Sequence, residues 1–158
     1  MCEAADILPT SLQWLLKEAP AFPLHSSNVH ILQEPSEFYA VLKERLSTAK
    51  KRITLASLYL GNGKLEQQLV QELEQQLEAR PGLEVLWLLD YTRGSRQPHS
   101  SRQTLQPLMH YPNCQVSLFH TPELRGFLKW LLPQRWNEVV GLQHMKLYIF
   151  DDALLISG

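Results

Sequence analysis

The stretch EVLWLLD, residues Glu84–Asp90, decides the fold class. Five apolar residues follow one another from Val85 to Leu89, without the alternation expected of a strand that has one solvated face. Such a run is typical of a strand in a sheet that is covered on both faces. The stretch therefore predicts a sheet layered with helices.

The segments on the amino-terminal side of this stretch alternate between helical and strand patterns. Residues 52–60 are rich in β-forming side chains and predict a strand. Pro35 opens an earlier helix, and residues 28–32 are expected to form a further strand. Between 52–60 and Pro81, apolar residues recur at three- and four-residue steps and predict a helix; they are Leu65, Leu69, Val70, Leu73 and Leu77.

The alternation continues on the carboxyl-terminal side. The sequence predicts a polar loop over 91–101, a short helix over 104–110, a strand over 114–120, a helix over 122–132, and two closely spaced strands over 143–150 and 153–157. This order of elements predicts an α/β layered domain.

The composition of the 158-residue chain excludes several classes of protein. Hydrophobic residues make up 44% and charged residues 20%, which excludes a disordered chain. The net charge of −1 provides no basic field, so we expect no nucleic-acid partner. Cys2 and Cys114 are too few for a disulfide framework or a cysteine-rich zinc site. The acidic amino terminus resembles neither a secretory signal nor a transit peptide, and no apolar run is long enough to cross a membrane.

The chemistry-bearing stretch is QHMKLYIFD, residues 143–151. His144 and Lys146 lie two residues apart, so both would project from one face of the predicted strand. A neutral imidazole can attack phosphorus near pH 7, and a neighbouring ammonium stabilises charge on the phosphoryl oxygens. Asp151 lies an odd number of residues from His144 and is expected to end the strand or fix the next turn. The alternative is a half-buried strand that carries one His and one Lys by chance.

The surrounding motifs favour the chemical interpretation. The pattern His-x-Lys-x4-Asp, followed by Gly158, resembles the signature of the phospholipase D superfamily, which normally continues with a small residue and an Asn. Four further segments resemble eukaryotic phosphatidylglycerophosphate synthases of the mitochondrial cardiolipin pathway; they are ASLYLG (56–61), DYTRGSR (90–96), SLFHTP (117–122) and GLQH (141–144). The resemblance runs from about residue 12 to Gly158. It implies an α-β-α layered sandwich with a mixed, mostly parallel sheet.

The resemblance also implies an activity and roles for three residues. A phosphatidyl group would pass from CDP-diacylglycerol to glycerol 3-phosphate through a phosphohistidine, releasing CMP. His144 would be the histidine of the first motif, Lys146 its phosphate-binding lysine and Asp151 its third member. No metal or other cofactor is expected, because lysines supply the positive charge, and the implied location is the mitochondrion.

Only one such motif is present in the chain. Complete relatives carry a second phospholipase D-like half, whose histidine serves as acid and base. We therefore expect residues 1–25 to be an extension, 26–158 to be a first domain truncated at its carboxyl-terminal end, and the isolated chain to be inactive. Pairing of two chains through His144 is a further alternative.

Two other segments are candidate substrate-binding sites. Arg93, Ser95 and Arg96 form a basic loop after a predicted strand, where guanidinium groups could grip the phosphates of either substrate; the alternative is an exposed polar turn. Ser57 and Tyr59 are expected near the substrate. They belong to ASLYLGNGK (56–64), which lacks the first glycine and the hydroxyl residue of a nucleotide-binding loop.

A third segment, residues 122–136, is a candidate membrane-surface helix. Phe127 with Trp130 and Trp136 would meet the lipid interface, close to Arg125 and Lys129; a core-packing helix is the alternative. The sequence is also compatible with two other functions. One is a nuclease of the phospholipase D type, and the other is a non-catalytic truncated product that binds lipid or a partner.

Overall fold

A computed structural model describes residues 8–122 and 141–158. The chain divides into two compact units, Met1–Glu37 and Phe38–Gly158. In the first unit the described elements are the 3-10 helix η1 (Thr10–Leu12), α2 (Leu15–Glu18) and the 3-10 helix η2 (Ser26–Asn28), none of which contains a buried residue.

The prediction of a strand over residues 28–32 is wrong. Val29 and Ile31 are 52% and 85% exposed, and no strand of the described sheet pairs with this segment. A short β-rich sequence forms a strand only where a neighbour supplies its hydrogen-bonding partners, and here none does.

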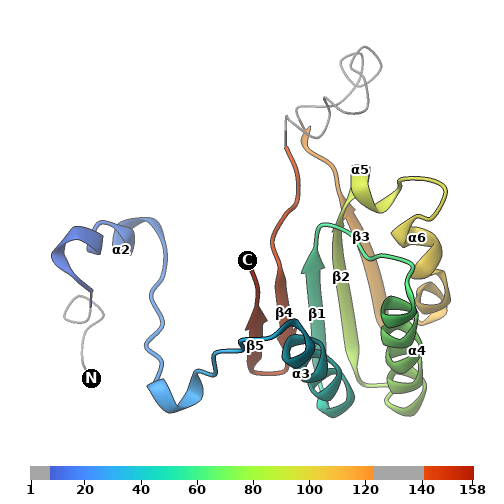
Figure 1. The fold of residues 1–158 in the computed structure, drawn as a ribbon, viewed down its shortest axis with the longest axis horizontal. Coiled ribbons are helices and arrows are strands. Elements are labelled where there is room, and N and C mark those ends of the chain that lie inside the picture. Colours follow the sequence, from blue (N-terminus) through green and yellow to red (C-terminus); the bar gives the residue numbers. More distant parts are fainter. Residues whose placement is uncertain (1–7, 123–140) are drawn as a thin grey trace. The chain divides into compact units, whose positions relative to one another are not determined.

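The second unit is built on a five-stranded mixed sheet in the order β3-β2-β1-β4-β5 (Figure 1). β1 runs parallel to β2 and β2 parallel to β3, whereas β4 is antiparallel to both β1 and β5. The strands are β1 (Arg52–Ser57), β2 (Glu84–Asp90), β3 (Cys114–Phe119), β4 (Leu147–Phe150) and β5 (Ala153–Ile156). The predicted α/β architecture with a mixed sheet is therefore confirmed.

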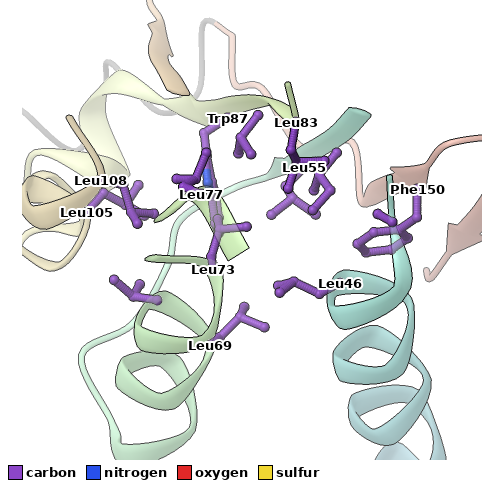
Figure 2. Packing of buried hydrophobic residues seen from close by; sticks show 14 of the residues in the cluster. Leu46, Leu55, Leu69, Leu73, Leu77, Leu83, Trp87, Leu105, Leu108 and Phe150 are labelled. Atoms are coloured by element: carbon purple, nitrogen blue, oxygen red, sulfur yellow. The ribbon is translucent and has the colours of Figure 1, made fainter. Parts of the chain in front are cut away.

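Two long helices supply part of the hydrophobic core. α3 (Pro35–Thr48) and α4 (Lys64–Ala79) direct their buried leucines at one face of the sheet (Figure 2). On α4 these are residues of the predicted apolar series. The buried cluster includes Leu42, Leu46, Leu69, Leu73 and Leu77 from the helices, and Ile53, Leu55, Val85, Trp87, Leu89 and Phe150 from the strands.

The other face of the sheet is more open among the described residues. Leu86 on β2 is 46% exposed, and Leu154 and Ile156 on β5 are 59% and 65% exposed. The run Val85–Leu89 predicted a strand covered on both faces, but β2 alternates in burial. The continuous hydrophobicity of a strand therefore does not establish that both of its faces are covered.

Three shorter elements lie between β2 and β3: α5 (Tyr91–Gly94), α6 (Ser101–Thr104) and the 3-10 helix η3 (Gln106–His110). The predicted loop over 91–101 thus contains a helical turn, and the predicted helix over 104–110 is divided. Ser100 and Gln103 form a reciprocal capping box at the start of α6, which fixes an earlier helix start than predicted.

The last predicted strand pair is correct in place but not in extent. β4 begins at Leu147 rather than at residue 143, so His144 and Lys146 precede the strand instead of lying on it. The β1–β4 ladder ends where Ala56 pairs with Leu147, and the residues before Leu147 lie outside it.

Candidate active site

Four chain segments meet at one edge of the sheet (Figure 1). The parallel strands β1, β2 and β3 all end there, and β4, which runs in the opposite direction, begins there. Loops beyond the carboxyl ends of parallel strands are the common location of ligand sites in α/β sheets. The edge therefore collects residues 57–60, 90–96, 120–122 and 141–146.

Asp90 links three of these segments. It is 2% exposed at the end of β2, and its Oδ1 accepts hydrogen bonds from the Thr92 hydroxyl and from the Arg93 N–H (2.9 Å). Its Oδ2 accepts from the Gln143 N–H at 3.2 Å, and its own N–H donates to the Leu58 carbonyl at 3.1 Å. One buried carboxylate thus caps α5 and positions the segment that carries His144. We did not predict this role, although a carboxylate closing an apolar strand was a signal for it.

His144 is exposed and Lys146 is partly buried, and neither pairs with a carboxylate among the described residues. The Ser157 N–H donates to the Lys146 carbonyl at 3.3 Å, which holds the backbone beside β5. Ile53 pairs with Phe150 and Leu55 with Tyr148. Continuing this antiparallel register by one same-face step would place Lys146 opposite Ser57, at the end of β1.

Asp151 lies at the opposite end of β4 from His144. Its carboxylate accepts three backbone hydrogen bonds, from the N–H groups of Lys50 (2.8 Å), Lys51 (2.8 Å) and Arg52 (3.0 Å). At about 3.3 Å per residue, the five residues from Lys146 separate the two side chains by about 16 Å. The structure therefore does not bring Asp151 together with His144, and its contacts are those of a turn-fixing residue.

The backbone around Asp151 is unusual. The residue has a φ of 51°, a left-handed conformation that Asp tolerates better than most residues. The hydrogen bonds from Lys50, Arg52 and Lys51 lower the pKa of the Asp151 carboxyl, because they stabilise its charged form. The carboxylate thus joins the β4–β5 turn to the start of β1.

The predicted basic loop is divided between the site and solvent. Arg93 lies in α5, directly after the Asp90 cap, and is partly buried, as is Ser95, whereas Arg96 is exposed. The Ser95 hydroxyl is buried and has no hydrogen-bond partner within residues 8–122 and 141–158. Arg93 and Ser95 therefore lie at the same edge of the sheet as His144, and Arg96 faces solvent.

Ser57 and Tyr59 both lie where β1 ends. Ser57 is partly buried and Tyr59 is 54% exposed, and the Ser57 hydroxyl donates to the Tyr59 carbonyl at 3.5 Å. Both line a cavity of about 210 Å³. The structure therefore brings Ser57 to the same edge as Lys146.

Two polar residues at this edge were not predicted as site residues. Gln143 is 5% exposed, and both polar atoms of its carboxamide are without a partner in the part of the chain that the structure describes. His120 stacks edge-on against Tyr91 with ring centroids 5.0 Å apart, and its Nδ1 lies 3.1 Å from the Thr121 carbonyl oxygen. Both lie within segments that carry the family resemblance, SLFHTP (117–122) and GLQH (141–144), but spacing alone gives no sign that Gln143 would be buried.

The three predicted membrane-interface residues, Phe127, Trp130 and Trp136, lie outside the described residues. Within 8–122 and 141–158, no cluster of three or more His, Cys, Asp or Glu side chains could hold a metal ion. A search of the described helices finds none with the length and hydropathy of a membrane span.

Comparison with known sequences identifies close relatives of the chain. It is 52% identical over 154 residues to the mitochondrial CDP-diacylglycerol–glycerol-3-phosphate 3-phosphatidyltransferase of Gallus gallus and 47% identical to that of Homo sapiens. A probable enzyme of the same name from Dictyostelium discoideum is 43% identical over 159 residues. The first two alignments cover 92% of this chain but 28% of each relative, so the chain spans under a third of their length. No protein-family model matches it.

Two solved structures have folds similar to that of this chain. Phosphatidylserine synthase from Haemophilus influenzae superposes with a TM-score of 0.64 and 26% identity over 84% of this chain and 28% of that one. NucT from Helicobacter pylori superposes with a TM-score of 0.52 over 77% of this chain and 65% of that one; at 16% identity this likeness concerns the fold alone. The chain is therefore a phospholipase D-like α/β domain homologous to part of the mitochondrial CDP-diacylglycerol–glycerol-3-phosphate 3-phosphatidyltransferases.

Proposed function

We propose that this chain forms one half of the active site of a mitochondrial enzyme that transfers a phosphatidyl group from CDP-diacylglycerol to glycerol 3-phosphate. The observation that supports this most strongly is the position of His144 and Lys146. Both lie at the sheet edge where three parallel strands end, and neither is paired with a carboxylate of the described residues. The proposed substrates and the mitochondrial location are supported by the 47–52% identity to enzymes whose names state them.

The imidazole of His144 would act as the nucleophile. Its nitrogen attacks the phosphorus that carries the diacylglycerol; a P–N bond forms, and the P–O bond to CMP breaks with its electron pair on the CMP oxygen. A hydroxyl of glycerol 3-phosphate then attacks the same phosphorus, and the P–N bond breaks to restore His144. The Lys146 ammonium would stabilise the charge on the phosphoryl oxygens during both steps.

The remaining residues at the edge would bind and orient the substrates. The Arg93 guanidinium suits phosphate oxygens, and Ser95, whose buried hydroxyl has no partner among the described residues, would lie beside it in the same loop. Arg96 and Tyr59 would contact the outer part of a substrate, because both are exposed. Ser57 would lie beside Lys146. We also propose that the protein meets its lipid substrate at the membrane surface, using Phe127, Trp130 and Trp136.

A second histidine must protonate the leaving group and deprotonate the acceptor. We propose that a second phospholipase D-like half supplies it, since the fold contributes one such motif here. The isolated 158-residue chain is therefore expected not to turn over CDP-diacylglycerol. Sustained synthesis of phosphatidylglycerophosphate by the chain alone would contradict this part of the proposal.

A graft tests the assignment. The matching segment of the Gallus gallus enzyme is replaced by these 158 residues, and product formation from CDP-diacylglycerol and glycerol 3-phosphate is measured. The proposal predicts an active graft that loses at least about 1,000-fold in rate with His144→Asn. The matched control is His110→Asn, an exposed histidine on η3.

Two results would contradict the proposal. One is a folded, active graft whose rate survives His144→Asn. The other is cleavage of single-stranded DNA without any phosphatidyl transfer, which would favour a nuclease.

A further inference from the structure

A largely apolar cavity of about 210 Å³ lies between α3, α4 and the end of β1. Its inner part is formed by side chains of the hydrophobic core, including Leu42, Leu69 and Trp87. An engineered apolar cavity of about 150 Å³ is large enough to bind benzene, so this one has room for a segment of hydrocarbon chain.

The mouth of the cavity is also apolar. Tyr59 and Leu65, which lie on either side of the loop between β1 and α4, are both 54% exposed. Large hydrophobic side chains gathered at the opening of a hollow are typical of a binding site rather than of a packing defect. The Glu66 carboxylate lies against the backbone of Gly61 and Gly63, on the loop side of the cavity.

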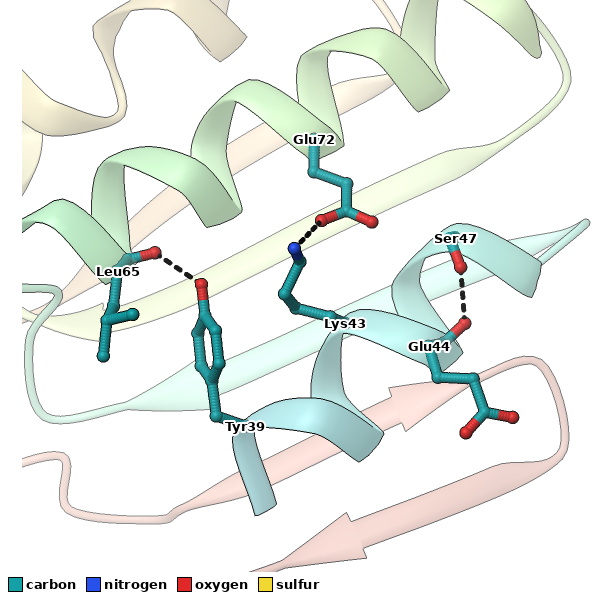
Figure 3. A network of polar contacts seen from close by, with 6 residues as sticks. All are labelled: Tyr39, Lys43, Glu44, Ser47, Leu65 and Glu72. Atoms are coloured by element: carbon teal, nitrogen blue, oxygen red, sulfur yellow. Dashed lines mark hydrogen bonds and ion pairs between the residues drawn. The ribbon is translucent and has the colours of Figure 1, made fainter. Parts of the chain in front are cut away.

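Polar contacts between the two helices hold the walls of the cavity in place. The Tyr39 hydroxyl donates to the Leu65 carbonyl at 2.9 Å, and Lys43 forms an ion pair with Glu72 at 3.2 Å (Figure 3). Because Tyr39 and Leu65 both line the cavity, this hydrogen bond directly joins α3 to the start of α4 at its wall.

The cavity adjoins the proposed phosphate site. Ser57 and Tyr148 form part of its wall, and Tyr148 lies two residues after Lys146. The register that pairs Leu55 with Tyr148 would place Ser57 opposite Lys146, so the wall reaches the residues assigned to the phosphoryl group. A molecule with a phosphate at Lys146 could therefore place an attached apolar group in the cavity.

We propose that this cavity binds one acyl chain of the lipid substrate while His144 and Lys146 hold the phosphate. The inference rests on the proposed function and adds an acyl-chain subsite to it. The lining favours a hydrocarbon over the cytosine base, because a base needs several hydrogen-bonding partners and leucines with Trp87 form the inner part. The Glu66 carboxylate would also repel the diphosphate, so the nucleotide would lie elsewhere at the edge.

Trp87 provides a direct probe of the cavity. In the 158-residue chain Trp14, Trp130 and Trp136 are replaced by Phe, which keeps an aromatic ring at the two positions proposed to meet the membrane and leaves Trp87 as the only tryptophan. The probe is a short-chain phosphatidic acid with bromine atoms on one acyl chain, compared with the same lipid without bromine. The inference predicts saturable quenching of Trp87 by the brominated lipid only.

A matched pair of substitutions tests the location. Leu65→Asp places a charge at the mouth, and its position in the first turn of α4 favours an acidic residue, so folding is preserved. Its control is Leu154→Asp on β5, where the leucine is 59% exposed. Leu65→Asp is expected to raise the apparent dissociation constant at least about tenfold, and Leu154→Asp less than twofold. Absence of quenching, or equal effects of the two substitutions, would overturn the inference.

A third variant separates this inference from the proposed function. His144→Asn removes the nucleophile but leaves the cavity intact, so Trp87 quenching is expected to persist. Quenching that persists while the graft transfers no phosphatidyl group would leave the acyl-chain subsite standing and reject the reaction. Transfer without quenching of Trp87 would reject the subsite and leave the reaction standing.

Discussion

The carboxylate of Asp90 accepts a hydrogen bond from the backbone N–H of Gln143, 53 residues further along the chain, at 3.2 Å. This contact joins the end of β2 to the segment that carries His144, before β4 begins. The same carboxylate caps α5, on which Arg93 lies. Asp90 therefore positions two parts of the proposed site without itself being assigned a chemical role.

Replacing Asp90 should destabilise the fold. Asn keeps one acceptor oxygen but presents an NH₂ group where the carboxylate accepts its other hydrogen bonds, so Asp90→Asn leaves buried donors unsatisfied. We expect a loss of about 2 kcal/mol in the free energy of unfolding, measured by urea denaturation. The control Asp152→Asn, at an exposed aspartate, should change it by less than about 0.5 kcal/mol. An unchanged urea midpoint for Asp90→Asn would contradict the proposed role of Asp90 in joining these segments.

Asp151 predicts a dependence of stability on acid pH. Backbone hydrogen bonds lower its pKa in the folded state, so its contribution is complete above the ordinary carboxyl pKa of about 3.9. That contribution is lost as the pH falls through the lowered folded-state pKa. Melting temperatures between pH 6 and pH 2 should therefore fall less steeply in Asp151→Asn than in the parent chain. Equal slopes in the two proteins would contradict this account, and Asp152→Asn serves as control.

Lys146 should be needed for the phosphoryl chemistry and dispensable for folding. In the graft, Lys146→Met is expected to lower kcat at least about 100-fold, as loss of one group that stabilises transition-state charge does. Lys146→Arg should restore part of the rate, because the charge is kept. The control Lys50→Met changes an exposed lysine just before the start of β1 and should leave kcat unchanged. A Lys146→Met graft with normal kcat would exclude the proposed role.

Cys114 should be a slow nucleophile in the folded chain. Burial at the start of β3 raises the pKa of its thiol to about 11, so little thiolate is present at pH 8. Alkylation by iodoacetamide, followed by mass spectrometry, should label Cys114 at least about tenfold more slowly in native buffer than in urea. Equal rates would show that this end of β3 is open.

The sequence predicted the elements that have a strong local signal. The bounds of β2 were predicted correctly from an apolar run that ends in Asp90, and α4 from its helical series of leucines. Asp151 lies an odd number of residues from His144, so its side chain was expected on the other face of the strand and in a turn-fixing role. Its three backbone hydrogen bonds confirm that it fixes the turn.

The errors occurred where pairing over long sequence separations decides the structure. Residues 28–32 have strand-forming side chains but no strand of the described sheet pairs with them. β4 begins only at Leu147, where its ladder with β1 ends at Ala56. The link from Asp90 to Gln143 and the cavity beside Tyr148 also depend on contacts between distant segments. No periodicity in the sequence reports such contacts.

In the proposed reaction His144 becomes covalently bonded to phosphorus. The graft is incubated with CDP-diacylglycerol in the absence of glycerol 3-phosphate, digested under mildly alkaline conditions and examined by mass spectrometry. We expect a phosphatidyl group on His144, retained in His110→Asn and discharged when glycerol 3-phosphate is added. An adduct on a different residue, or an active graft that never carries one on His144, would contradict it.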